Sequence, residues 1–165
     1  YYKAVYQSCK DLFDALTYIK KMGVKKVVCM GFSSGAIMSL VTLIDTYPFL
    51  SMENPHRDFV KGVISIAGTL DSNEFLGAPP NNKFNIIKYI DKKSPPSLLW
   101  HGDNDIIVPK NGVIGIKKKY DELDKKEECK LFLLEKIGHG ESINATKDNK
   151  NIVDYSLDFI KNLVK

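Results

Sequence analysis

The sequence predicts an α/β fold in which a parallel sheet is flanked by helices. After a first helical segment, strand-like and helix-like segments alternate four times along the chain. The apolar run 27–30, Val-Val-Cys-Met, is typical of a parallel strand that helices cover on both faces. A turn rich in glycine and serine, residues 31–35, follows it directly. The length of 165 residues suits a single domain, 1–165, with a substantial core.

The first helix is expected over 3–22, where apolar side chains recur at helical spacing. Gly23 is a natural C-cap for it, because glycine readily adopts the left-handed conformation that ends many helices. The helix after the glycine-rich turn has little polar surface and is expected to be buried. In order, the elements that follow the first helix are strand 24–30, helix 34–46, loop 47–58 and strand 60–67.

The alternation resumes after an irregular segment, 68–94, in which a short helix is expected at 85–90. The next helix could be capped at its N-terminus by Asn111. The closing helix carries its apolar residues on one face. In order, these elements are strand 97–100, loop 101–109, helix 111–123, strand 129–135, loop 136–141 and helix 149–164. Such an alternation predicts parallel strands joined by right-handed crossovers.

The composition excludes several classes of protein. The formal net charge is +4, but the lysines are scattered and do not form the basic stripe with aromatic residues that a nucleic-acid site needs. No apolar run is long enough to span a bilayer, and no signal peptide opens the chain. The sequence leaves the compartment unassigned, with the cytoplasm slightly favoured.

The cysteines argue against a disulfide framework and against a zinc site. Cys9, Cys29 and Cys129 are odd in number and widely spaced. Cys29 lies in the middle of the first strand and is expected to be a small buried hydrophobic residue. No metal and no cofactor are expected.

The turn Gly31-Phe32-Ser33-Ser34-Gly35 fits the pattern G-x-S-x-G. A serine hydroxyl is a weak nucleophile at neutral pH and needs an exposed position and an adjacent base. A sharp strand-to-helix turn lifts Ser33 to the top of the sheet, and the flanking glycines let the backbones on either side approach closely. The following helix places the Ser34 N–H where an oxyanion would form. The alternative is an ordinary turn, because short Gly/Ser patterns also occur by chance.

The other candidate groups follow strands whose carboxyl ends share one edge of a parallel sheet, where sites form. Asp103 and Asp105 follow the third strand, and His139 follows the fourth. The chain order Ser, Asp, His is the one expected for a hydrolase triad on this architecture. His139 would take the proton of Ser33, and an aspartate would hold its imidazole in the required tautomer. The glycines that flank His139 allow its loop to bend toward the serine.

Three motifs resemble those of α/β-hydrolases, in particular the branch of esterases that includes dienelactone hydrolases, acetyl-xylan-esterase-like and prolyl-oligopeptidase-like enzymes. They are the turn 31–35, the run 95–109 (PPSLLWHGDNDIIVP) and the triplet 138–140 (Gly-His-Gly). The second motif is long and specific, and the order and spacing of all three agree with the family. The resemblance implies that Asp105, the second acidic position of the long motif, is the triad acid.

The resemblance also sorts the remaining candidates. Asp103 is the fallback acid and otherwise a turn residue that caps its loop. His101 matches a structural position of the long motif and is not the base. His56, beside Pro55, is expected to be a surface loop residue.

The chain departs from the family pattern in two places. Ala36 stands where a second glycine often follows the elbow, and its methyl group should be tolerated. The resemblance covers only the C-terminal part of the family's fold, so its upstream strands and a His-Gly-Gly-like loop with a second oxyanion donor have no counterpart here. Strand 24–30 would then lie at an open sheet edge, which is an aggregation hazard. Since the chain also begins at Tyr1, we expect it to be a fragment, a processed piece or a swapped partner, with a missing N-terminal segment or a second chain completing the sheet.

The sequence therefore predicts a serine hydrolase that cleaves small-molecule carboxylic esters through an acyl-enzyme. Ser33 is the expected nucleophile, His139 the acid/base and Asp105 the orienting acid. The Ser34 N–H is one expected oxyanion donor, and Phe32 is a candidate pocket residue.

Two alternative functions stay open. A serine peptidase or acyl-peptide hydrolase shares these motifs, and an N-terminal β-propeller in the parent gene would favour it. A hydrolase-fold protein that binds without catalysis is the other alternative, because the second oxyanion loop has no counterpart in the chain. The irregular segment could contribute an apolar pocket wall, or its apolar residues could pack on the sheet. These residues are Phe75, Leu76, Phe84 and Ile86.

Overall fold

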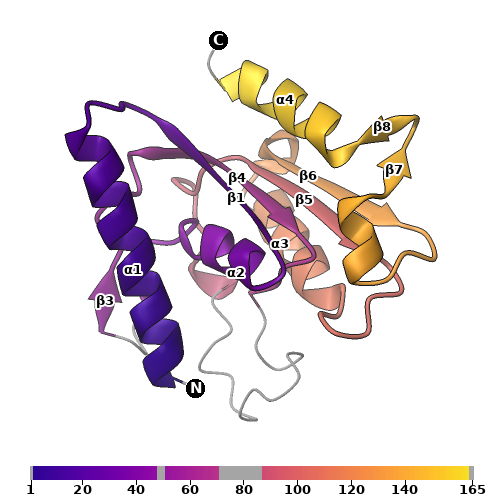
Figure 1. Ribbon diagram of the computed structural model, residues 1–165, viewed down its shortest axis with the longest axis horizontal. Helices are drawn as coiled ribbons and strands as arrows, with labels where there is room; N and C mark the ends of the chain where they lie inside the picture. The colour runs from indigo at the N-terminus through magenta and orange to yellow at the C-terminus, as the bar shows by residue number, and fades with distance from the viewer. Residues whose placement is uncertain (1, 48–50, 71–86, 164–165) are drawn as a thin grey trace.

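The computed structural model describes residues 2–47, 51–70 and 87–163 and confirms the α/β fold. Its centre is a four-stranded sheet in the order β1-β4-β5-β6, in which every neighbouring pair is parallel (Figure 1). The strands are β1 (Val27–Phe32), β4 (Val60–Ile66), β5 (Ser97–Gly102) and β6 (Cys129–Leu134). Since the carboxyl ends of parallel strands meet at one edge, the residues that follow β1, β5 and β6 are brought together.

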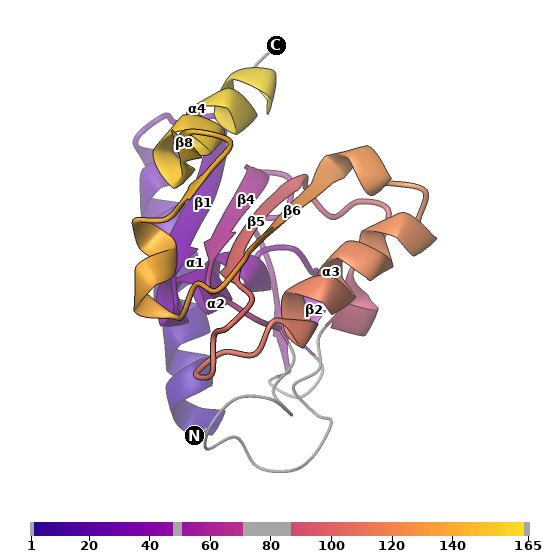
Figure 2. The same ribbon diagram turned by 90° about the vertical axis from the view of Figure 1, so that its right-hand side faces the viewer.

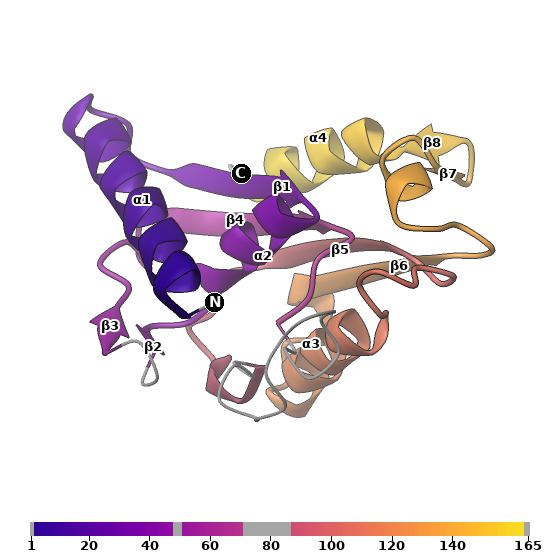
Figure 3. The same ribbon diagram turned by 60° about the horizontal axis from the view of Figure 1, so that its bottom comes forward.

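Four α-helices in the described residues cover the two faces of this sheet. They are α1 (Tyr2–Lys21), α2 (Ser34–Val41), α3 (Asn111–Glu122) and α4 (Ile152–Leu163). The first three lie on one face and α4 lies on the other, as Figure 1, Figure 2 and Figure 3 show together. Coverage of both faces explains why every residue of β5, and every residue of β4 except Lys61, is buried.

Alternate side chains along the strands separate into two hydrophobic clusters. Val63 of β4 and Leu99 of β5 belong to the larger cluster, which includes side chains of α1, α2 and α3. Their neighbours Ile64, Leu98 and Trp100 belong to the second cluster, together with side chains of α4. Because successive side chains of a strand point to opposite faces, the same sheet contributes to two hydrophobic cores, one on each face.

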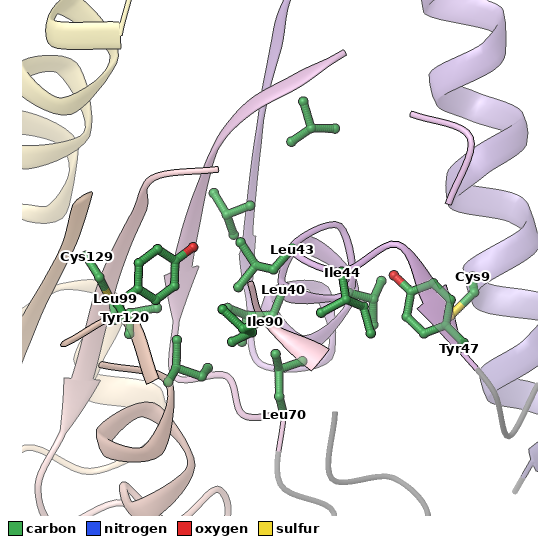
Figure 4. Close-up of a cluster of buried hydrophobic side chains, with 14 of the residues drawn as sticks. Cys9, Leu40, Leu43, Ile44, Tyr47, Leu70, Ile90, Leu99, Tyr120 and Cys129 are labelled. Atoms are coloured by element: carbon green, nitrogen blue, oxygen red, sulfur yellow. The ribbon is translucent and has the colours of Figure 1, made fainter. Parts of the chain in front are cut away.

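The larger cluster extends from α1 to β6 (Figure 4). Tyr47 lies beside Cys9 at one end, and Tyr120 lies near Cys129 at the other. Burial raises the pKa of the Cys9 thiol to about 11 and that of Cys129 to about 12, so both stay protonated at neutral pH. All three cysteines are free thiols, and Cys29, expected to be buried, is only half-buried because β1 is an outer strand.

Short elements connect the main ones. Among the described residues they are β2 (Thr46–Tyr47) paired with β3 (Met52–Glu53), β7 (Thr146–Lys147) paired with β8 (Lys150–Asn151), and the 3₁₀ helices η3 (Ile87–Tyr89), η4 (Lys126–Glu128) and η5 (Gly140–Ile143). The antiparallel pair of β2 and β3 lies where the sequence predicts the last residue of a helix and a loop. The candidate pocket-wall residues lie outside the described residues; they are Phe75, Leu76, Phe84 and Ile86.

The helix predicted over 34–46 is wrong at its C-terminal end, because α2 stops at Val41. Thr42 ends it with a side-chain hydrogen bond to the Ser39 carbonyl at 2.7 Å. The amide of Asn54 then donates to the carbonyls of Thr42 and Ile44 at 3.3 and 3.0 Å. These carbonyls are thereby satisfied by a distant side chain and not by a further helical turn.

The closing helix also begins later than predicted, at Ile152 instead of 149. The hairpin of β7 and β8 occupies the preceding residues and turns at Asp148 and Asn149, which have φ values of 52° and 59°. Asn151 and Asp154 then cap α4 reciprocally, each side chain accepting the other's backbone N–H at 3.0 Å.

Two further predictions are wrong. Lys110, and not Asn111, is the N-cap residue of α3, and it makes no side-chain capping bond. His56 is buried instead of lying on the surface, because its Nε2 lies 2.9 Å from both the Phe13 carbonyl and the Thr17 hydroxyl of α1. The predicted C-cap of α1 is confirmed. Gly23 has a φ of 89°, and its N–H donates to the Lys20 carbonyl.

The first strand lies at an edge of the sheet, as predicted, although it spans β1 and not 24–30. Met30 in this strand is 48% exposed. β5 continues to Gly102, two residues beyond its predicted end, because it pairs with β6 as far as Leu134. No helix in the described part of the chain is long and apolar enough to cross a membrane.

Candidate active site

Ser33 lies at the sharp turn between β1 and α2. Its φ of 54° and ψ of −118° are strained for a residue with a side chain. The Ser33 N–H donates to the Ile66 carbonyl at 2.9 Å, which holds the turn on the end of β4. The serine hydroxyl is thereby presented at the carboxyl edge of the sheet.

The two glycines of the turn have different roles. A Cβ atom on Gly31 would lie 2.2 Å from the carbonyl carbon and oxygen of Gly35, so the close approach requires glycine at 31. A Cβ atom on Gly35 itself would meet nothing within 4 Å. Ala36 is fully buried, and a Cβ atom on Gly68 would lie 2.6 Å from its methyl group. The absence of a side chain at Gly68 therefore leaves room for Ala36.

His139 follows β6 and its two ring nitrogens face the other candidate residues. Its Nε2 lies 2.8 Å from Ser33 Oγ, and its Nδ1 lies 2.7 Å from Asp105 Oδ2. Since a carboxylate can only accept, Nδ1 carries the proton in the neutral ring and Nε2 is the acceptor. This tautomer can take a proton from the serine hydroxyl.

Asp105 is buried, and backbone groups fix its carboxylate. Its Oδ1 accepts the N–H groups of Ile107 and Val108 at 2.9 and 2.8 Å. Oδ2 is left to face His139. Asp103, the fallback acid, instead accepts the backbone N–H of Lys136 at 2.7 Å, so it ties the loop after β5 to the loop before His139.

A buried tryptophan of β5 holds the loop that carries His139. The indole Nε1 of Trp100 donates to the Ser142 carbonyl at 2.7 Å, and the Ser142 hydroxyl donates to the His139 carbonyl at 2.6 Å. Glu141 accepts the Gly138 N–H at 2.9 Å. Sequence reasoning missed Trp100 and Ser142, and no local pattern marks a bond between residues so far apart in the chain.

Phe32 and Ser34 flank Ser33 on either side. The ring centroid of Phe32 lies 5.2 Å from that of His139, with 39° between the planes, so Phe32 packs on the imidazole. Ser34 is the first residue of α2, where backbone N–H groups have no partner within the helix. The Ser33 side chain makes no capping bond to them. These N–H groups and the positive end of the helix dipole are suited to a developing negative charge.

Residues 2–129 match the family described as serine hydrolase (FSH1). The chain belongs to this FSH1 family of serine hydrolases. The matched segment includes Ser33 and Asp105 and ends before His139. No curated protein matches the chain. Within the described ranges, no group of three or more His, Cys, Asp or Glu side chains could hold a metal ion.

Solved structures of esterases share the fold of this FSH1-family chain. A truncated form of a carbohydrate esterase from gut microbiota has a TM-score of 0.71 at 19% identity, over 95% of this chain and 68% of that one. Esterase 2 of Thermogutta terrifontis, phosphoramylated by tabun, has a TM-score of 0.67 at 19% identity, over 97% and 62%. The carboxylesterase Cest-2923 of Lactobacillus plantarum WCFS1 has a TM-score of 0.69 at 12% identity, over 93% and 66%. The chain thus spans 62 to 68% of these three proteins.

Proposed function

We propose that this FSH1-family chain cleaves carboxylic esters through an acyl-enzyme formed on Ser33. The observation that carries the proposal is the continuous path of short contacts from Asp105 through His139 to Ser33. A base in contact with the serine, and an acid that orients the base, are the requirements for activating a serine hydroxyl. Both lie at the carboxyl ends of the strands, beside the strained turn that carries the partly buried serine.

In the proposed reaction, His139 Nε2 takes the proton of Ser33 as Oγ attacks the ester carbonyl carbon. The tetrahedral oxyanion accepts a hydrogen bond from the Ser34 N–H. Collapse expels the alcohol oxygen, which takes the proton from His139 and leaves the acyl group on Ser33. His139 then takes a proton from water as the water oxygen attacks the acyl carbon. It gives this proton to Ser33 Oγ as the acyl–oxygen bond breaks, which releases the carboxylic acid and regenerates the serine. Asp105 stabilises the imidazolium in both steps and is not itself protonated.

Two other functions compete with ester cleavage. A peptidase or acyl-peptide hydrolase would use the same three residues on an amide bond. A binding protein of the same fold would use the site without turnover. Loss of one oxyanion donor typically costs about a hundredfold to a thousandfold in rate, so the proposed esterase can be slow and still catalytic if Ser34 is its only such donor.

Intact mass after treatment with a fluorophosphonate probe tests the nucleophile. We expect one adduct on the wild-type chain and none on Ser33→Ala. Ser8→Ala is the matched control, because Ser8 is an exposed serine on α1, and it should retain the adduct. A folded wild-type chain without an adduct would overturn the catalytic proposal in favour of binding.

Substrate comparison separates the two enzymatic functions. We expect p-nitrophenyl acetate to be hydrolysed with a burst that matches the number of active sites, and the burst to be absent in Ser33→Ala. An N-acetylated amino-acid p-nitroanilide should be turned over far more slowly. Faster cleavage of the anilide than of the ester would replace the esterase proposal with the peptidase one.

A further inference from the structure

His101 is a buried histidine that the proposed reaction does not use directly. It lies in β5, its side chain is fully buried, and its Nε2 lies 2.7 Å from the Val108 carbonyl oxygen. A carbonyl only accepts hydrogen bonds, so Nε2 carries the proton and donates it. Nδ1 of the same ring has no hydrogen-bond partner among the described residues. Every directed interaction of this imidazole is therefore made by Nε2.

Val108 connects His101 to the proposed acid. Its carbonyl accepts from His101, and its N–H donates to Asp105 Oδ1 at 2.8 Å. Both polar groups of one buried residue are thus engaged, one by the strand and one by the carboxylate. The loop that carries Asp105 is tied to β5 by a side chain of β5 itself.

The same nitrogen also lies close to the carboxylate oxygen that faces the proposed base. His101 Nε2 is 3.6 Å from Asp105 Oδ2, and both side chains are fully buried. This distance is too long for a hydrogen bond, but in a buried site the partial positive charge of the N–H group still attracts the carboxylate oxygen. Oδ2 therefore lies between His101 on one side and His139 on the other.

His101 is suited to this position because it stays neutral. Burial lowers its pKa, while the Val108 carbonyl and Asp105 oppose the decrease and His139 adds to it. Asp105 and His139 are the two titratable side chains that contribute electrostatically to this pKa. A neutral donor leaves Asp105 as the partner of a single cation, the imidazolium of His139.

We propose that His101 is a positioning residue for Asp105: its imidazole N–H fixes Val108 and, through it, the carboxylate that orients His139. This inference rests on the proposed hydrolase function for its kinetic consequences. Its structural part, the link from strand to carboxylate, can be measured without turnover.

The test compares two variants that differ in the donor. His101→Gln can place an amide N–H close to the position of Nε2, whereas His101→Leu fills the site without a donor. We expect His101→Leu to lower kcat per titrated active site by about ten- to a hundredfold with KM unchanged, because small misplacement of catalytic groups has effects of that size. His101→Gln should restore kcat to within a few fold of wild type.

A second readout reports on the hydrogen bond directly. The proton shared by His139 Nδ1 and Asp105 should give a proton NMR resonance well downfield of the amides. We expect this resonance to broaden or disappear in His101→Leu and to return in His101→Gln. If the wild-type chain neither reacts with the probe nor hydrolyses ester, the proposed function fails, and the resonance still decides whether His101 positions Asp105.

The control is the other buried histidine. His56 also lies within hydrogen-bond distance of a backbone carbonyl, that of Phe13, but it contacts α1 and not the candidate site. His56→Leu should lower stability without changing kcat per titrated site. If His101→Leu proves insoluble, His101→Asn and His101→Gln make the same comparison, since the shorter amide cannot reach Val108. Equal kcat and equal resonances in the Gln variant and the Leu or Asn variant would overturn the proposal.

Discussion

Gly31 and Gly35 face each other across the turn that carries Ser33, and the space between them admits no side chain on Gly31. A Cβ atom there would lie 2.2 Å from the Gly35 backbone and 2.6 Å from the Ala36 nitrogen. The constraint acts in one direction, because a Cβ atom on Gly35 would meet nothing within 4 Å. In the pattern G-x-S-x-G, the close approach of the two backbone segments thus requires glycine at position 31 but not at position 35.

This asymmetry predicts opposite effects of two alanine substitutions on stability. Gly31→Ala should lower the free energy of unfolding by at least about 2 kcal/mol, because backbone atoms must move to admit the methyl group. Gly35→Ala should leave it unchanged or raise it by up to about 1 kcal/mol, since alanine favours the helix. Urea unfolding of both variants measures the difference. Equal destabilisation by the two substitutions would contradict the geometry of the turn.

The indole of Trp100, in β5, holds the loop of His139 through its hydrogen bond to the Ser142 carbonyl. Trp100→Phe keeps an aromatic ring but removes the donor to the buried Ser142 carbonyl. We expect a loss of about 1–3 kcal/mol in the free energy of unfolding, because a buried carbonyl loses its partner. We also expect kcat to fall as the loop loosens. Urea unfolding and ester hydrolysis, compared per titrated active site, measure both effects.

Phe132→Leu is the control for lost packing in the same aromatic group. The Phe132 ring lies 5.3 Å from that of Trp100, and a phenyl ring, unlike the indole, can donate no hydrogen bond to η5. This variant should lose stability while keeping kcat per active site. A fall in kcat as large as that of Trp100→Phe would mean that packing, and not the indole hydrogen bond, holds the loop.

Buried neutral histidines predict that the protein loses stability in mild acid. Burial lowers the pKa of His56 and His101 below the ordinary value of 6.5, so the unfolded chain binds protons there more readily than the folded chain. The contribution of these two histidines to the free energy of unfolding is therefore fully present above pH 6.5. It decreases as the pH falls below that value. Unfolding free energies at about pH 7.5 and about pH 5.5 measure the decrease before most carboxylates titrate.

His56→Gln isolates the contribution of one histidine to this pH dependence. The variant should lose less stability than wild type between the two pH values, because the unfolded chain gains one proton fewer. An identical loss in both proteins would show that His56 is not responsible. His56 lies away from the candidate site, so its substitution leaves Ser33, His139 and Asp105 in place.

The sequence was most informative where local geometry restricts the residue type. Ser33 follows an apolar strand and precedes a helix, so the turn could be located from the pattern alone. The parallel sheet followed from the alternation of elements, and the edge position of β1 followed from the family resemblance. The C-terminal end of α2 could not be predicted, because Asn54, twelve positions beyond Thr42, donates to the carbonyls that would accept hydrogen bonds in a longer helix.

Tertiary contacts explain the other differences between sequence and structure. His56 is adjacent to a proline, which suggested an exposed loop, but α1 supplies a carbonyl and a hydroxyl that bury it. The contacts of Trp100 with Ser142 and of His101 with Asp105 depend on how η5 and the loop after β5 pack on the sheet. No periodicity in the chain reports such contacts.

The outer edge of β1 leads to the last prediction. We propose that a further strand, from another segment of the protein or from a second chain, pairs with this edge. In the described sheet β1 pairs only with β4, and Met30 is 48% exposed. An unpaired apolar edge promotes lateral association, and charged residues on edge strands suppress it.

Met30→Lys should therefore reduce the concentration-dependent increase in mass that we expect from this chain in light scattering. Met22→Lys is the control, because Met22 is 68% exposed in the turn after α1 and belongs to no strand. It adds the same charge without altering the edge. If both variants associate equally, net charge and not the edge of β1 controls association, and if neither associates less than wild type, another surface is responsible. A wild-type chain that stays monomeric at every concentration would leave no association for the edge to explain and would contradict pairing with a second copy.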